Sequence, residues 1–279
     1  MPPHPQALFS LVPFRENERA ELAVSHPNNR HRVSTLPEGV EALEVGLHIC
    51  SKSSTTTLAT LGRCPDADIY LDGSSIARIQ CSFEIDLVTR VVMLYDRSHG
   101  CTTQFSGEDA KPFQHGRQVR KVLVQHNLNT IIGMGGERQD LFQFKLIWHQ
   151  NPTETEKTIK GYNAHAYGRM ENPRLTRTVD EAPTDLPSRR ETRPHMPGQR
   201  QLEMRYVKEE PALGCGQFGT VYKAIDVDSG KFMAVKILKP SSQKSKQEWG
   251  SLYNNTFKRE VETLSKITHV SKTFNHLYT

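Results

Sequence analysis

A short run of glycines constrains the C-terminal part of this chain more than any other feature. Gly214, Gly216 and Gly219 follow the pattern G-x-G-x-x-G, and glycine lets a backbone approach phosphate oxygens because it has no Cβ atom. Dinucleotide-binding folds use the same spacing, but they place a helix after the third glycine. Here residues 220–227 and 231–238 are rich in β-forming residues and flank an Asp-Ser-Gly turn. The sequence therefore predicts a phosphate-covering loop within a β-sheet.

The segment from Leu213 to Lys236 resembles the Gly-rich loop and the following strand lysine of protein kinases. The resemblance implies that Lys236 contacts the α- and β-phosphates of ATP and that apolar side chains of the segment enclose the adenine. It assigns ATP binding to Leu213, Gly214, Cys215, Gly216, Gln217, Phe218, Gly219, Val221, Ala234 and Lys236. An ordinary β-hairpin with unconstrained glycines is the alternative.

A helix is predicted over residues 253–268, with Phe257 and Leu264 on its apolar stripe. Glu260 lies at the edge of that stripe, where a glutamate is ordinarily a solvated surface residue. By the kinase resemblance it is the αC glutamate, which pairs with Lys236 and completes the ATP-binding set. Residues 205–269 are thus predicted to be a partial kinase N-lobe.

The catalytic motifs of a kinase are absent from these 279 residues, which contain no His-Arg-Asp, Asp-Phe-Gly or Ala-Pro-Glu. By the resemblance they supply no catalytic residue and no metal ligand. We therefore expect ATP and Mg²⁺, the cofactors of the family, to bind weakly or not at all, and we expect no phosphoryl transfer. Residues 270–279 are a non-family tail, and our hypothesis is that they translate an unspliced intron of a longer gene product.

An all-β sandwich is predicted over residues 41–150, where short strands alternate with turn signals. Phe142, Phe144 and Trp148 alternate with polar residues, as expected of a half-buried final strand. Residues 1–40 are expected to be mostly irregular, with at most one leading strand. The candidate strands are 44–50, 56–62, 69–71, 81–85, 91–96, 121–123, 129–133 and 141–148.

Two spots in this sandwich resemble the forkhead-associated (FHA) domain, which binds phosphothreonine. Leu61-Gly62-Arg63 is similar to its Gly-Arg motif, and residues 96–102 are similar to its Asp-x-Ser-x-Asn-Gly-Thr loop. Guanidinium and hydroxyl donors suit a phosphate dianion because such hydrogen bonds are charge-assisted. The resemblance implies that Arg63 is the main phosphate ligand, although an ordinary surface arginine is the alternative. The other implied phosphopeptide contacts are Ser75, Arg78, Ser98, His99 and Thr102.

Two departures from the FHA pattern put phosphothreonine binding in question. The family's Ser-x-x-His aligns with residues 77–80, so Ala77 and Gln80 replace a phosphate-binding serine and a loop-bracing histidine. Gly100 stands where the family has an asparagine that contacts the peptide backbone. Ser74, Ser75 or Arg78 can supply donors in their place. An FHA fold without intact phosphothreonine binding is therefore the alternative.

Residues 151–204 are predicted to be a flexible linker, because prolines interrupt a polar segment with few large apolar groups. A sandwich, a disordered linker and an incomplete α+β kinase N-lobe, in that order, resemble the FHA-bearing Ser/Thr kinases of the checkpoint type. The resemblance implies a phosphothreonine-containing protein partner and protein substrates. The alternative is a non-catalytic phosphopeptide-binding adaptor. Only Thr103-Gln104 and Ser242-Gln243 match the Ser/Thr-Gln sites of an upstream damage kinase, which does not favour such a signal.

Charge, cysteine spacing and hydrophobic run length bear on nucleic-acid binding, metal binding, location and membrane insertion. The net charge is +5, but 31 acidic residues are interspersed with 36 basic ones and no basic block of five occurs, which does not favour nucleic-acid binding. The five cysteines have no C-x-x-C spacing, so we expect no metal site and an intracellular location, in nucleus or cytoplasm. No apolar run approaches the length of a membrane span.

Overall fold

The computed structural model of the protein describes residues 1–114, 117, 119–136, 141–161, 205–216 and 219–238. The described elements belong to two units, an N-terminal one and one that is formed by the strands after residue 204. None of the described helices combines the length and the apolar character needed to cross a bilayer.

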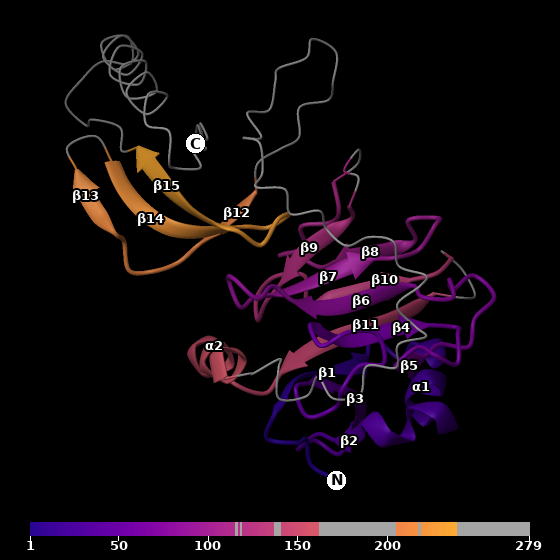
Figure 1. Ribbon diagram of the computed structural model, residues 1–279. Coiled ribbons are helices and arrows are strands. Elements are labelled where there is room, and N and C mark those ends of the chain that lie inside the picture. Colours follow the sequence, from indigo (N-terminus) through magenta and orange to yellow (C-terminus); the bar gives the residue numbers. More distant parts are fainter. Residues whose placement is uncertain (115–116, 118, 137–140, 162–204, 217–218, 239–279) are drawn as a thin grey trace. The chain divides into compact units, whose positions relative to one another are not determined.

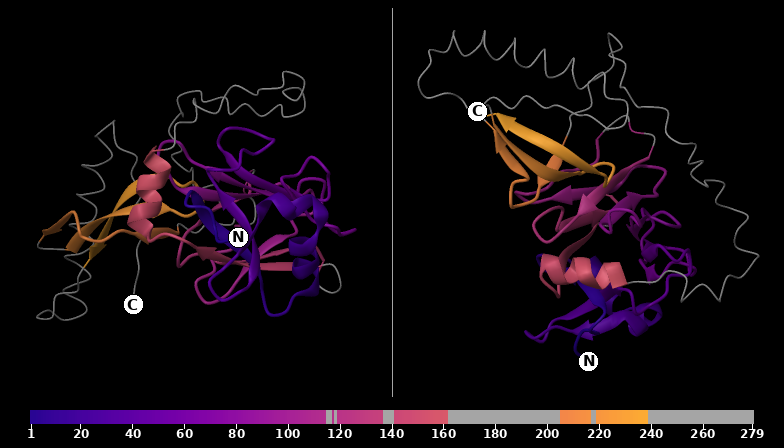
Figure 2. Two further views of the ribbon diagram at one scale, coloured as in Figure 1. Left: turned by 90° about the horizontal axis from the view of Figure 1, so that it is seen from below. Right: turned by 60° about the vertical axis from the view of Figure 1, so that its left-hand side comes forward.

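Two sheets packed face to face form the N-terminal unit (Figures 1 and 2). All their strand pairs are antiparallel except β4 with β5. The six-stranded sheet has the order β2 (Val33–Thr35), β3 (Glu41–Gly46), β1 (Ala7–Pro13), β11 (Phe142–Trp148), β10 (Ile131–Met134), β8 (Thr103–Ser106). The five-stranded sheet has the order β5 (Ile69–Tyr70), β4 (Thr57–Gly62), β6 (Cys81–Ile85), β7 (Val92–Asp96), β9 (Lys121–Val124).

Apolar side chains from both sheets meet in the core. The ring of Phe9 on β1 lies 5.0 Å from that of Phe83 on β6, in an edge-to-face arrangement. The predicted alternation of the final strand is confirmed, because Phe142 and Phe144 are buried while Lys145 between Phe144 and Leu146 is exposed. The predicted all-β sandwich is therefore observed as an architecture.

The expectation that residues 1–40 are mostly irregular is wrong. They form β1, helix α1 (Glu18–Ser25), the 3₁₀ helix η1 (Pro27–Arg32) and β2. Strand β1 lies between β3 and β11 in the six-stranded sheet. Its stability comes from pairing with strands that are distant in the sequence, and local patterns do not report such pairing.

Two further elements differ from the expected boundaries. Strand β8 was not predicted, because its alternate residues Gln104 and Ser106 are exposed at a sheet edge and only four residues pair. Helix α2 (Pro152–Gly161) occupies the start of the predicted linker, with Thr155 and Ile159 buried. Residues 162–204, the rest of that linker, lie outside the described part of the chain.

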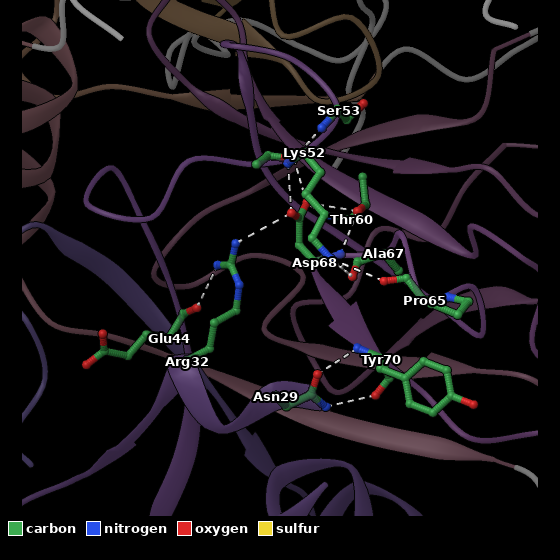
Figure 3. Close-up of polar contacts among 11 residues, drawn as sticks. Asn29, Arg32, Glu44, Lys52, Ser53, Thr60, Pro65, Ala67, Asp68 and Tyr70 are labelled. Carbon is green, nitrogen blue, oxygen red and sulfur yellow. Dashed lines mark hydrogen bonds and ion pairs between the residues drawn. The ribbon is translucent and has the colours of Figure 1, made fainter. Parts of the chain in front are cut away.

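A buried ion pair attaches the N-terminal segment to the second sheet (Figure 3). Arg32 is 1% exposed, and its Nη2 lies 3.8 Å from Oδ1 of Asp68, which is 2% exposed. The Asp68 carboxylate also accepts hydrogen bonds from the backbone N–H groups of Lys52 and Thr60, at 2.9 and 2.8 Å, and from the hydroxyls of Ser51 and Thr60. The carboxylate therefore has four donors besides the guanidinium, and it would keep these hydrogen bonds if the guanidinium were removed.

This geometry predicts unequal costs for the two partners. We expect Asp68→Ala to lower the free energy of unfolding by about 3 kcal/mol or more, because it leaves four donors without their acceptor and a buried guanidinium without its carboxylate partner. We expect Arg32→Met to cost only about 1 kcal/mol, since the carboxylate keeps its hydrogen bonds. Urea denaturation measures both values, and equal losses would contradict this assignment.

Three histidines make the stability of this unit dependent on pH. Burial lowers the pKa of His31, His48 and His149 below the ordinary value of 6.5, and the nearby Glu44 only partly offsets this for the last two. The unfolded chain therefore binds more protons than the folded one as the pH falls through 6.5. The stabilising effect of keeping these side chains neutral is complete above that value and decreases as the pH falls towards the lowered pKa values.

We expect the melting temperature of the N-terminal unit to fall between about pH 7 and about pH 5.5. His149→Gln removes one of the titrating groups, so its melting temperature should fall less over the same range. Thermal unfolding followed by circular dichroism at several pH values checks this. An identical pH dependence in the variant would show that His149 does not contribute.

The second unit is a small antiparallel sheet made of β12 (Tyr206–Lys208), β13 (Gly214–Gly216), β14 (Gly219–Asp226) and β15 (Phe232–Leu238). Strands β12 and β13 pair with two successive parts of β14, and β15 also pairs with β14. The predicted strands 220–227 and 231–238 are confirmed to within one residue at each end. The predicted helix over residues 253–268 lies outside the described residues.

Candidate functional site

The described residues of the glycine-rich segment form two paired strands. Gly216 on β13 pairs with Gly219 on β14, and β14 continues as a strand from Gly219. A dinucleotide-binding turn would continue as a helix at this point, so the structure excludes that alternative.

Three residues predicted to bind ATP share one face of the small sheet. Gly214 pairs with Val221, and Val221 pairs with Lys236 across β14 and β15. Directly opposite residues of antiparallel strands place their side chains on the same face, and residues two apart in one strand do so too. Val221, Ala234 and Lys236 therefore lie on one face, level with the start of the glycine-rich segment.

The other predicted ATP contacts are placed less directly. Leu213 precedes β13, is 64% exposed, and donates its backbone N–H to the carbonyl of Val221 at 2.8 Å. The Cys215 sulfur lies 3.4 Å from the Thr220 hydroxyl, so its side chain is on the face opposite Val221 and Lys236. Only the backbone of Cys215 is available to the lysine-bearing face. Gln217, Phe218 and Glu260 lie outside the described residues, and the pairing of Lys236 with Glu260 stays a prediction.

The fold itself does not require the first two glycines. A Cβ atom added to Gly214 would meet no described atom within 4 Å, and one added to Gly216 would meet only a carbonyl oxygen at 3.8 Å. Neither glycine has a φ in the left-handed region. The backbone conformation and the packing of the described residues therefore both permit a larger residue at these two positions.

In the N-terminal unit, the end of β4 lies tightly against the loop between β5 and β6. The backbone N–H groups of Arg63 and Cys64 donate to the carbonyls of Ala77 and Arg78, both at 3.1 Å. A Cβ atom on Gly62 would overlap the backbone carbonyl of Arg78. The Gly-Arg pair is therefore constrained here by close packing of two backbones.

Two cations lie at this end of the sandwich. The side chains of Arg63 and Arg78 are exposed. Within the described residues neither guanidinium forms an ion pair, and the one side-chain contact of Arg78 is from Nη2 to the sulfur of Cys64, at 3.7 Å. Ser75, a third predicted contact, is exposed and accepts a hydrogen bond from the backbone N–H of Gly136, at 3.1 Å. Positive charge is thus available to an anion at this end.

Asp96 organises the loop between β7 and β8. Its Oδ1 accepts from the backbone N–H of Ser98 at 3.0 Å, from the Ser98 hydroxyl at 2.7 Å and from the Thr103 hydroxyl at 3.0 Å. Its Oδ2 accepts from Nε of Arg120 at 2.9 Å, and Nη2 of Arg120 donates to the carbonyls of Cys101 and Thr103. The loop is therefore fixed without a ligand.

The predicted contacts in this loop differ in what they offer a ligand. The hydroxyl of Ser98 is buried, donates its proton to Asp96 and accepts from the backbone N–H of Thr102 at 2.9 Å. It therefore holds the loop together and has no proton left for a phosphate. His99 is exposed and Thr102 is half-buried. Thr103, in one of the two Thr/Ser-Gln sites, is only 2% exposed.

Sequence reasoning missed Gln80, which it treated only as the loss of a histidine. The side chain is 0% exposed, and its Oε1 accepts from the backbone N–H of Ala77 at 3.0 Å. Its Nε2 donates to the hydroxyls of Thr102 and Thr103, at 2.9 and 3.0 Å. The amide thus connects the β5–β6 loop to the β7–β8 loop. The sequence signal for this role is a side chain with both a donor and an acceptor that lies between the Gly-Arg motif and the 96–102 loop.

Comparison with known proteins gives one family match. The family model for the protein kinase domain matches residues 207–273, less than half of the chain, and this segment contains the glycine-rich strands and Lys236. No curated protein matches the sequence. The segment that the structure shows as a small antiparallel sheet is therefore similar in sequence to a protein kinase domain.

Two solved structures show a distant likeness. A crystal structure of Rad53 1-466 in complex with AMP-PNP has 15% identity and a TM-score of 0.47, over 96% of this chain and 52% of that chain. Mycobacterium tuberculosis EmbR in complex with a low-affinity phosphopeptide has 15% identity and a TM-score of 0.26, over 50% of this chain and 24% of that chain. The present chain thus spans about half the length of the Rad53 chain.

The surroundings of the glycines predict opposite effects of alanine. We expect Gly62→Ala to destabilise the N-terminal unit by about 2 kcal/mol or more, because the added Cβ overlaps a backbone carbonyl. We expect Gly214→Ala to change stability by less than about 1 kcal/mol, with stabilisation the favoured sign. Urea denaturation of both variants checks this, and a large loss in Gly214→Ala would show that the fold itself needs that glycine.

Proposed function

We propose that the chain is part of a Ser/Thr protein kinase with an N-terminal FHA-like domain that binds phosphothreonine-containing proteins. The kinase segment supplies the glycine-rich cover and Lys236 for the phosphates of Mg-ATP, with protein Ser/Thr hydroxyls as acceptors. The match over residues 207–273 supports this assignment. The observation that carries the nucleotide site is that Gly214 and Gly216 are not required by the fold. We propose action inside the cell, in nucleus or cytoplasm, in keeping with five free cysteines.

The phosphothreonine site is supported by two features of the N-terminal unit. Arg63 and Arg78 present guanidinium groups at the end of the sandwich where three loops are joined by hydrogen bonds. Charge-assisted bonds to a phosphate dianion are about twice as strong as neutral ones, so a preformed set of cations favours a phosphorylated over an unmodified threonine. Arg63 is the proposed main ligand, with Arg78, His99 and Thr102 as further contacts.

Binding to immobilised peptides tests this site. The full chain is incubated with a degenerate peptide library that carries a fixed phosphothreonine, and with the same library carrying threonine. We expect retention only by the phosphorylated library, and we expect Arg63→Ala to lower affinity by about tenfold or more, since a hydrogen bond to a charged group contributes about 1.5–3 kcal/mol. Arg30→Ala, an exposed arginine on η1, is the matched control and should bind like the wild type. Equal retention of both libraries would refute the site.

The kinase proposal is tested on a longer gene product that carries the catalytic motifs. We expect transfer of phosphate from ATP to protein Ser/Thr, and a loss of at least about a hundredfold in Lys236→Met, because the lysine positions the α- and β-phosphates. For the 279 residues alone we expect no transfer, and no micromolar affinity for Mg-ATP in calorimetry. Inactivity of the longer product would favour a non-catalytic phosphopeptide-binding adaptor, which is consistent with the absence of catalytic motifs in these residues.

A further inference from the structure

Gln80 is connected to its surroundings by backbone hydrogen bonds as well as by its side-chain amide. Its backbone N–H donates to the carbonyl of Leu61 on β4 at 2.7 Å, and its carbonyl accepts from the N–H of Arg97 at 2.9 Å. Together with the amide bonds to Ala77 and Thr102, this one residue connects β4, the β5–β6 loop and both ends of the β7–β8 loop. The three segments that carry the proposed phosphate contacts, the end of β4 and the two loops, are therefore connected by hydrogen bonds through Gln80.

The connection bears directly on the proposed ligands. Ala77, whose N–H is held by the Gln80 side chain, accepts the backbone hydrogen bond of Arg63 through its carbonyl. Thr102, whose hydroxyl is held by the same side chain, is itself a proposed contact. Without the Gln80 amide, the backbone at Arg63 and the hydroxyl of Thr102 would move independently, and the two would no longer present their donors at a fixed spacing.

We propose that Gln80 is the positioning residue of the phosphothreonine site: its buried amide sets the distance between the Arg63 side and the Thr102 side before a ligand binds. This inference rests on the proposed phosphothreonine binding. An amide suits the task because one end accepts and the other end donates. Preorganised donors raise affinity because less ordering is needed when the ligand binds.

Three variants of the full chain separate positioning from stability. Gln80→Met keeps the approximate shape but leaves the Ala77 N–H without its acceptor, and we expect it to lower affinity for the selected phosphothreonine peptide by about tenfold. Gln80→His restores an acceptor and a donor on opposite sides of a ring, and should recover most of that loss. Thr103→Val removes one partner of the amide and one donor to Asp96 without touching an exposed group, and should give an intermediate loss.

The matched control is Asn129→Ala. Asn129 is also a buried amide: its Nδ2 donates to the carbonyl of Leu123 and its Oδ1 accepts from the N–H of Lys111, both at 2.7 Å. It follows β9, whose Lys121 end pairs near the β7–β8 loop and whose Val124 end pairs with Val92 at the far end of β7. We expect this variant to lose stability and keep its affinity, because it lies away from the loops.

Backbone amide NMR spectra of the free protein supply a second readout. In Gln80→Met the signals of residues 77 and 102 should shift together, while signals of the far end of β7 stay in place. Wild-type affinity in Gln80→Met, with the wild type binding the peptide, would overturn the positioning role alone. Failure of the wild type to bind any phosphothreonine peptide would overturn both proposals. If Gln80→Met does not fold, unchanged affinity in Thr103→Val would overturn the positioning role.

Discussion

Four hydrogen bonds converge on the buried carboxylate of Asp96, and the loop at the candidate phosphate site depends on them. Two come from Ser98, one from the Thr103 hydroxyl and one from Arg120. A buried charge must be paired and hydrogen-bonded to be tolerated, so the loop around it has little freedom to rearrange. Gln80 extends this arrangement to the neighbouring loop through Thr102 and Thr103. The exposed arginines therefore lie next to loops in which the buried side chains of Asp96, Ser98 and Gln80 already have hydrogen-bond partners.

A different constraint governs the glycine-rich sheet. Strand register pairs Gly214 with Val221 and Val221 with Lys236. It therefore fixes the position of the lysine backbone relative to the glycines. Among the described residues, no atom lies within 4 Å of the position that a Cβ of Gly214 would take. Gly214 and Lys236 thus lie level with each other in a segment that is similar in sequence to a protein kinase domain.

Much of the fold could be predicted from local patterns, and the errors have a common cause. Strands with clear alternation or flanking turns, such as β11 and β14, were placed within a few residues. Strand β1 and helix α1 were not, because their neighbours lie far away in the sequence. In the candidate site, the sequence singles out the motif residues as candidates, but it does not show the hydrogen-bonding roles of Ser98 and Gln80. The partner to which a hydroxyl or amide donates its hydrogen bond depends on tertiary geometry, and a sequence motif does not contain that information.

The place of β1 in the middle of a sheet has a consequence for dissecting this protein. A recombinant fragment that starts near residue 41, where the sandwich seemed to begin, would lack the strand that joins β3 to β11. The apolar side chains of residues 7–9 would be missing from the interior. Strand β3 would lose both of its neighbours, β1 and β2, and β11 would expose an unpaired edge. Aggregation of such a fragment would reflect the cut and not the intrinsic solubility of the domain.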